Sequence, residues 1–141
     1  MKLTIKNSKS FPTQDGIAWS ATLYIDGIKA AYAYDEGNGG EISVEWVNLD
    51  LEKKFGEYVD TLPLESGHKQ DAGAAIAGLV DQHEADKKIK RWCKTQTVFQ
   101  LKGDTFGHFR TVKSPFAPAV KKYLVDKYGD KLDTIYNETL I

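Results

Sequence analysis

The sequence has only one cysteine, Cys93, in its 141 residues. A single thiol excludes an internal disulfide framework and any metal site built on paired thiolates. Long apolar runs are also missing, because no stretch approaches the ~18 consecutive apolar residues that cross a bilayer. Residues 1–6 lack the apolar segment of a secretory signal peptide. These absences predict a cytoplasmic protein, in the cell that makes it or in a host cell, with no membrane contact and no cofactor.

Nothing in the length or the composition calls for a second domain. A chain of this size buries roughly 68% of its unfolded surface, which is enough for one core. Its 41% hydrophobic and 28% charged residues lie near the averages of globular proteins, which excludes a largely disordered chain. We therefore expect a single domain over residues 1–141.

The net charge of the chain is only −1, but residues 1–86 are net acidic and residues 87–141 are net basic. Residues 1–86 hold seven Lys/Arg and fifteen Asp/Glu, whereas residues 87–141 hold twelve and five. A basic region of this kind can attract an anionic partner. It can equally attract the acidic part of the same chain, or the acidic part of a second copy in a homodimer.

The strongest local pattern is that of a β-hairpin around Asp26-Gly27, a dipeptide favoured in two-residue type I′ turns. Apolar residues alternate on both sides of this turn. The register of a two-residue turn places Trp19 opposite Tyr34, with every apolar residue of that alternation on one face. Ala31 and Ala33 would then lie on the opposite, mixed face.

The remaining periodicity predicts an α+β protein with the element order ββββααββα. The hairpin joins two more strands in a four-stranded antiparallel meander, and two helices, a second β-hairpin and a C-terminal helix follow. Asp71 is the expected N-cap of the second helix, and residues 63–70 form a polar loop before it. Outside the hairpin, the expected elements are strands at 2–6 and 42–46, helices at 51–62 and 71–93, strands at 97–101 and 109–113, and helical pieces between 118 and 140.

Residues 87–94 form the main candidate for a binding site, because they hold five Lys/Arg together with Trp92. On a helix, four of these cations share one face that can follow a phosphate backbone. The alternative is a solvated helix end whose cations favour the helix dipole and whose tryptophan belongs to the core. The candidate ligand-binding residues are Lys87, Lys88, Lys90, Arg91, Trp92 and Lys94, with Arg110 and Lys113 as secondary candidates on opposite faces of a strand.

The glycine-rich residues 35–41 invite comparison with a phosphate-binding loop, but that comparison fails. A strand follows the glycines instead of a helix N-terminus, and the acidic side chains would repel an anion. A hairpin loop is the simpler interpretation. A divalent cation held by Asp35, Asn38 and Glu41 is the alternative, and it would suit a small metal-dependent enzyme acting on nucleotides or nucleic acid.

Catalytic residues are not indicated elsewhere. The three histidines, His68, His83 and His108, are scattered along the chain, and no nucleophile motif surrounds Cys93. No segment has the spacing of a zinc site, a Walker loop or a dinucleotide fingerprint. We therefore expect no catalytic residues and no metal, although enzyme activity is left open.

Two stretches resemble small uncharacterised proteins that phages and prophages carry. The first is Ala-Thr-Leu-Tyr-Ile-Asp-Gly-Ile-Lys-Ala at residues 21–30, together with the glycine-rich loop at 37–40. The second is Val-Phe-Gln-Leu-Lys-Gly at residues 98–103, leading to residues 110–113. They cover under half of the chain. The resemblance implies a role in phage physiology or phage–host conflict, and it implies no activity and no site residues.

The leading hypothesis is a non-enzymatic small binding protein that engages an anionic target through its basic segment. The target would be nucleic acid, a nucleotide or an acidic protein, and in a phage setting it would be a host or defence component. A protein-interaction module or homodimer without nucleic-acid binding is the first alternative. The small metal-dependent enzyme is the second.

Overall fold

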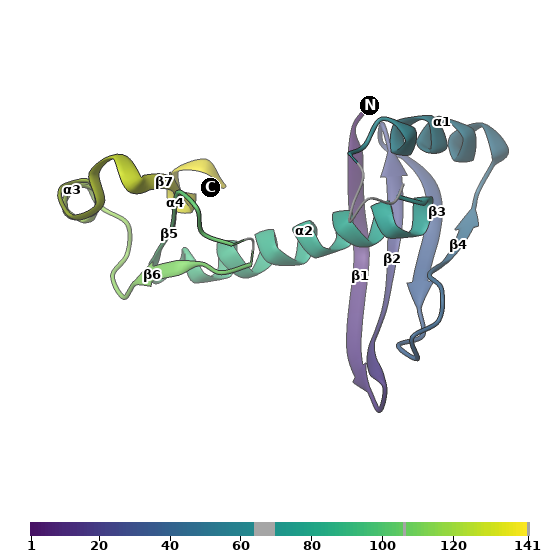
Figure 1. The fold of residues 1–141 in the computed structure, drawn as a ribbon, viewed down its shortest axis with the longest axis horizontal. Helices are drawn as coiled ribbons and strands as arrows, with labels where there is room; N and C mark the ends of the chain where they lie inside the picture. Colours follow the sequence, from purple (N-terminus) through teal and green to yellow (C-terminus); the bar gives the residue numbers. More distant parts are fainter. Residues whose placement is uncertain (64–69, 106, 141) are drawn as a thin grey trace. The chain divides into compact units, whose positions relative to one another are not determined.

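The structure, a computed structural model, describes residues 1–63, 70–105 and 107–140. It confirms the α+β class (Figure 1). The chain divides into two compact units, residues 1–83 and residues 84–141. The division falls within one long helix, and each unit is described by itself below. The single domain expected over the whole chain stays a prediction.

The first unit is built on the predicted four-stranded antiparallel meander, with the strand order β1-β2-β3-β4. The first strand is longer than the sequence pattern indicates, because polar residues after Lys6 continue to pair with the second strand. The four strands are β1 (Leu3–Thr13), β2 (Gly16–Ile25), β3 (Ile28–Asp35) and β4 (Ser43–Trp46).

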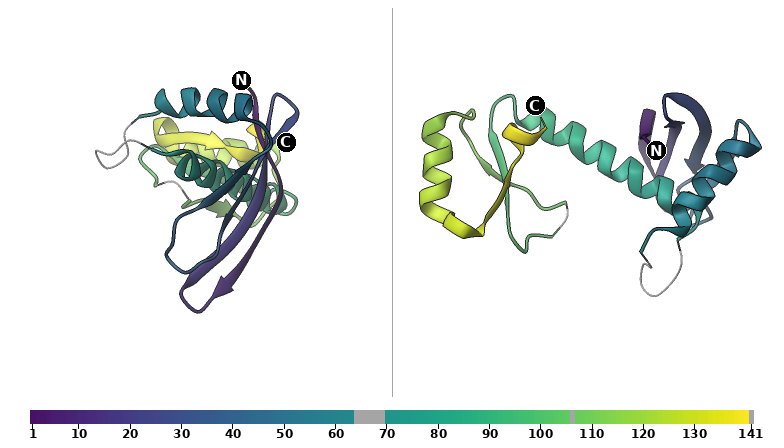
Figure 2. Two further views of the ribbon diagram at one scale, coloured as in Figure 1. Left: turned by 90° about the vertical axis from the view of Figure 1, so that its right-hand side faces the viewer. Right: turned by 90° about the horizontal axis from the view of Figure 1, so that it is seen from above.

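Two helices cover one face of this sheet, namely α1 (Leu49–Asp60) and the first part of α2 (Ala72–Trp92) (Figure 2). Asn48 begins α1, where its Oδ1 accepts the Leu51 N–H at 2.8 Å. The predicted cap of α2 is confirmed, because Asp71 Oδ1 accepts the Ala74 N–H at 2.7 Å. Apolar side chains from both helices pack with the sheet and form the core of the first unit.

The hairpin register differs from the predicted one. The strands pair as expected next to the turn, but a β-bulge at Ala30 shifts the pairing by one residue from there on. Trp19 therefore lies opposite Asp35, and its predicted pairing with Tyr34 is wrong. The carbonyl of the bulged residue remains satisfied, because it accepts the Val47 N–H at 2.8 Å.

The shift changes which side chains face the helices. Ala31 and Ala33 join the core and are fully buried, so their predicted place on the opposite face is wrong. Tyr32 and Tyr34 move to the other face of the sheet. The physical reason is space, since helices packed closely on a sheet leave room for methyl groups but not for phenol rings.

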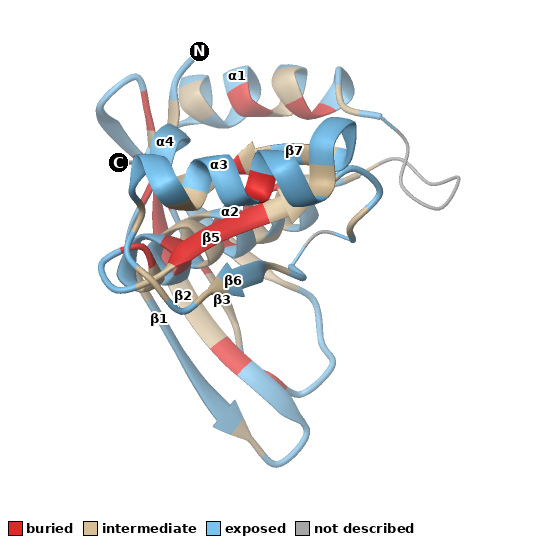
Figure 3. Cartoon of the chain, turned by 90° about the vertical axis from the view of Figure 1, so that its left-hand side faces the viewer, coloured by how far each residue is buried: buried red, intermediate tan, exposed pale blue. Residues whose placement is uncertain are grey.

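The second unit is built on a three-stranded antiparallel sheet with the order β6-β5-β7. The central strand β5 (Thr97–Leu101) and the edge strand β6 (Arg110–Val112) are the predicted second hairpin. Figure 3 shows the start of β5 in the buried class. The other elements are α3 (Pro118–Tyr128), the short 3-10 helix η1 (Gly129–Lys131), β7 (Leu132–Ile135) and α4 (Tyr136–Thr139).

Each face of this sheet has its own small core. Val98 faces the second part of α2, where it packs with Ile89 and Cys93. Phe99 faces the opposite way and packs with Leu124 of α3. The strand is therefore buried on both faces, which agrees with its continuous apolar run.

Residues 132–135 were expected to be helical, and this part of the prediction is wrong. They form β7, which pairs with the free edge of β5. The apolar spacing there suits a strand as well as a helix, and the open backbone groups of β5 favour the strand. Asn137 then fixes the chain end, because its Oδ1 accepts the Val98 N–H at 2.8 Å and its Nδ2 donates to the Gln96 carbonyl at 2.9 Å.

The polar loop predicted at 63–70 lies mostly outside the described residues, and so does His68. Among the helices that the structure describes, none has the length and apolar character required to cross a membrane.

Candidate functional site

The basic segment occupies the second part of α2 and the turn after it. Ile89 and Cys93 are buried on one side of this segment, and Trp92 is partly buried beside them. All five cations are exposed. The helical spacing of the sequence prediction is therefore confirmed for Lys87, Lys90 and Arg91, which lie away from the buried side, while Lys94 falls in the turn.

One cation of this segment forms a weak ion pair with an acidic neighbour. Lys87 Nζ lies 3.5 Å from Glu84 Oε1, and both side chains are about half exposed, so this pair contributes little. Within the described ranges, Lys90, Arg91 and Lys94 take part in no ion pair. We name the exposed cations Lys87, Lys88, Lys90, Arg91 and Lys94 the basic surface.

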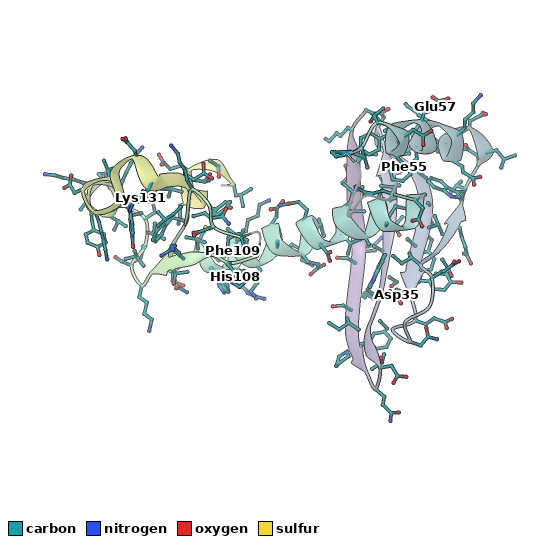
Figure 4. The ribbon with its side chains drawn as sticks, viewed as in Figure 1. Asp35, Phe55, Glu57, His108, Phe109 and Lys131 are labelled. Carbon is teal, nitrogen blue, oxygen red and sulfur yellow. The ribbon has the colours of Figure 1, made fainter. Side chains whose placement is uncertain are left out.

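A hollow of about 430 Å³ opens beside the basic surface. Lys87, Lys88 and Arg91 contribute to the lining, together with Phe109, whose aromatic ring is labelled next to His108 in Figure 4. That ring is half-buried and meets Tyr136 edge-on, with the centroids 5.5 Å apart. The lining residues are Glu84, Ala85, Lys87, Lys88, Arg91, Gly107 and Phe109.

Trp92 does not line this hollow. The ammonium group of Lys88 lies 4.8 Å from the centre of the Trp92 ring, so a cation of the chain itself occupies one face of the indole. Trp92 also packs against the core that Ile89, Cys93 and Val98 form. Phe109, for which the sequence pattern gives no signal, is the aromatic residue that lines the hollow together with the cations.

Arg110 is held elsewhere. Its Nε lies 3.0 Å from Asp104 Oδ2 and its Nη2 3.2 Å from Asp104 Oδ1, while Leu101 N–H donates to the same carboxylate. The hydrogen bonds from Arg110 and Leu101 lower the pKa of Asp104, and the same ion pair raises the pKa of Arg110. The guanidinium therefore stabilises the turn between β5 and β6.

The register of β6 separates the two secondary candidates. Arg110 lies opposite Phe99 and so belongs to the α3 face of the sheet. Lys113 is exposed directly after β6 and does not line the hollow. The structure therefore brings Lys87, Lys88 and Arg91 together around the hollow, and the other candidates Lys90, Lys94, Arg110 and Lys113 do not line it.

The glycine-rich loop uses its oxygens to hold its own backbone. Asp35 Oδ1 accepts the Gly37 N–H at 2.8 Å, and Asn38 Oδ1 accepts the Gly40 N–H at 3.0 Å. The Thr13 hydroxyl donates to the Gly37 carbonyl at 3.0 Å and ties the loop to β1. Among the described residues no three His, Cys, Asp or Glu side chains are grouped so as to hold a metal ion.

Cys93 and His108 occupy different environments. Cys93 is buried with Ile89 and Val98, and this burial raises the pKa of its thiol. A thiol held in its protonated form is a poor nucleophile. His108 is exposed in the turn region before β6.

Comparison with known proteins gives no match for this chain. No family model fits it, and no curated protein and no solved structure matches it.

Proposed function

We propose that the chain is a non-enzymatic binding protein that takes an anionic ligand at the basic surface. One observation carries this proposal. Lys87, Lys88 and Arg91 line the same hollow as Phe109, so three cations and an aromatic residue border one space. Phosphate groups need the first of these features and nucleobases need the second.

The two features together favour nucleic acid or a nucleotide over an acidic protein. Exposed cations alone are enough to bind the carboxylates of a protein partner. Stacking of a base on an aromatic ring adds about 1–3 kcal/mol per base to the binding free energy of a nucleic acid. The volume of about 430 Å³ falls within the range of roughly 300–1,000 Å³ that small-ligand sites have. The hollow is open to solvent at the surface of α2, so a single strand, whose bases are unpaired, is the form that fits it best.

Titration of labelled single-stranded DNA, duplex DNA and RNA at two salt concentrations tests this function. Fluorescence anisotropy reports the affinity. We expect single strands to bind more tightly than the duplex, with log affinity falling against log salt at a slope of ~0.7 per phosphate contacted. Absence of binding to all three probes at the lower salt concentration would remove nucleic acid as the ligand.

We also propose a cytoplasmic location and, from the resemblance of residues 21–30 and 98–103, a phage setting in which the target belongs to a host cell. A lone buried cysteine suits a reducing compartment and supports the first of these. The second is supported by the resemblance alone.

A further inference from the structure

The face of the first sheet that turns away from α1 and α2 carries a group of aromatic side chains. The bulge at Ala30 places Tyr32 and Tyr34 there, with ring centroids 5.7 Å apart. Phe11 of β1 is 61% exposed and Tyr32 is 40% exposed. Large exposed rings gathered on one surface are typical of binding sites, because a lone monomer gains nothing by exposing them.

These rings border a hollow of about 440 Å³. Ala18, Trp19 and Ser20 of β2 line its centre, and on the face that carries the rings the small residues Ala18 and Ser20 lie opposite Phe11 and Tyr34 in the strand register. The large side chains of β1 and β3 therefore extend farther from the sheet than the small side chains of β2, which lies between these strands. The hollow results from this alternation of size across the sheet.

Acidic side chains complete the rim. Asp35, Glu36 and Glu45 line the hollow, and no Lys or Arg is among its lining residues. Glu45 lies opposite Tyr32 in the register, which places its carboxylate beside that ring. Glu45 is exposed and forms no ion pair with any described residue.

The same face already shows the contact that such a site would make. Lys6 Nζ lies 4.5 Å from the centre of the Tyr24 ring. Tyr24 is two residues along β2 from Thr22, which lies opposite Tyr32. Among the described residues no cation lies over the rings of Tyr32 or Tyr34. Lys9 lies opposite Ser20 but does not line the hollow.

We propose that this hollow binds an arginine side chain of a basic polypeptide segment. A guanidinium group stacks on aromatic rings and donates two parallel hydrogen bonds to a carboxylate, whereas an ammonium group does neither as well. Tyr32 and Tyr34 provide the rings, and Glu45 provides the carboxylate. The exposed ring of Phe11 supports the apolar part of the segment beside the arginine.

Labelled peptides test this proposal on the full chain. We would compare an alternating glycine–arginine peptide with two matched peptides, one carrying lysine and one carrying citrulline, which keeps the shape of arginine without its charge. The arginine peptide should bind at least fivefold more tightly than the lysine peptide, and the citrulline peptide should show no measurable binding. Equal binding of the citrulline and arginine peptides would overturn the proposal.

Variants locate the site. Glu45→Gln should weaken binding of the arginine peptide about fivefold, and Tyr34→Ala should weaken it at least as much, while Tyr34→Phe retains it. Glu57→Gln is the matched control, because Glu57 is an exposed carboxylate on α1, away from Asp35 and the hollow (Figure 4). Equal losses in Glu45→Gln and Glu57→Gln would show attraction by net charge only and would contradict a built site. Nucleic-acid binding uses the other unit and is measured separately.

Discussion

At the scale of single residues, Gly37 connects the acidic loop to the sheet. Its φ of 78° lies in the left-handed region, and a Cβ built on it would lie 2.8 Å from Ala18 N and 2.9 Å from Ile17 C. Both atoms belong to the backbone of β2 and cannot move aside easily. The loop thus keeps its position beside the aromatic hollow because this residue has no side chain.

The variant Gly37→Ala should lower the free energy of unfolding by about 2–4 kcal/mol, since backbone strain and a steric clash act together. Gly39→Ala is the control. Gly39 has a similar φ of 80°, but a Cβ there would meet nothing within 4 Å, so only the strain of roughly 1 kcal/mol remains. Urea denaturation of the two variants measures the difference. Equal losses would mean that the tight packing at Gly37 is absent.

At the scale of elements, the hairpin register can be tested directly. With the bulge at Ala30, Ala33 is fully buried under the helices and Tyr32 is exposed. Ala33→Leu should therefore destabilise the chain by about 1–3 kcal/mol through overpacking. Tyr32→Leu should cost less than about 1 kcal/mol, as surface substitutions do. In a register without the bulge, Tyr32 would face the helices and Ala33 would not, so Tyr32→Leu would destabilise the chain more than Ala33→Leu. The denaturant midpoints of the two variants therefore distinguish the registers.

The sequence pattern was sufficient for most elements of both units. Alternation around Asp26-Gly27 and the cap at Asp71 are local signals, and the structure has both of them. The bulge at Ala30 had no such signal, because it depends on the space that helices leave above the sheet. The strand β7 was missed for a similar reason, since its partner is an edge far away in the sequence.

The candidate sites were only partly predictable. A run of cations is visible in any sequence, so the exposure of the five Lys/Arg of residues 87–94 could be expected. The contribution of Phe109 could not, because its approach to α2 depends on how the second hairpin packs. The pairing of Arg110 with Asp104 could not be expected either, because it depends on the geometry of the turn between β5 and β6.

At the scale of the whole molecule, the uneven charge coincides with the division into units. Residues 1–83 hold seven Lys/Arg and thirteen Asp/Glu, and residues 84–141 hold twelve and seven. The acidic unit carries the hollow proposed for arginine, and the basic unit carries the hollow proposed for nucleic acid. The net charge of each unit is thus opposite in sign to the charge of its proposed ligand, and high salt should weaken both interactions.

We expect the basic surface, rather than the net charge of the unit, to bind single-stranded nucleic acid. The most direct test compares two double charge reversals in the anisotropy assay. Lys87→Glu with Arg91→Glu alters the lining of the hollow, whereas Lys122→Glu with Lys131→Glu makes the same change of charge at exposed positions in α3 and η1. We predict that the first pair weakens binding of single-stranded DNA at least tenfold and the second less than about threefold. Equal weakening by both pairs would contradict a localised site.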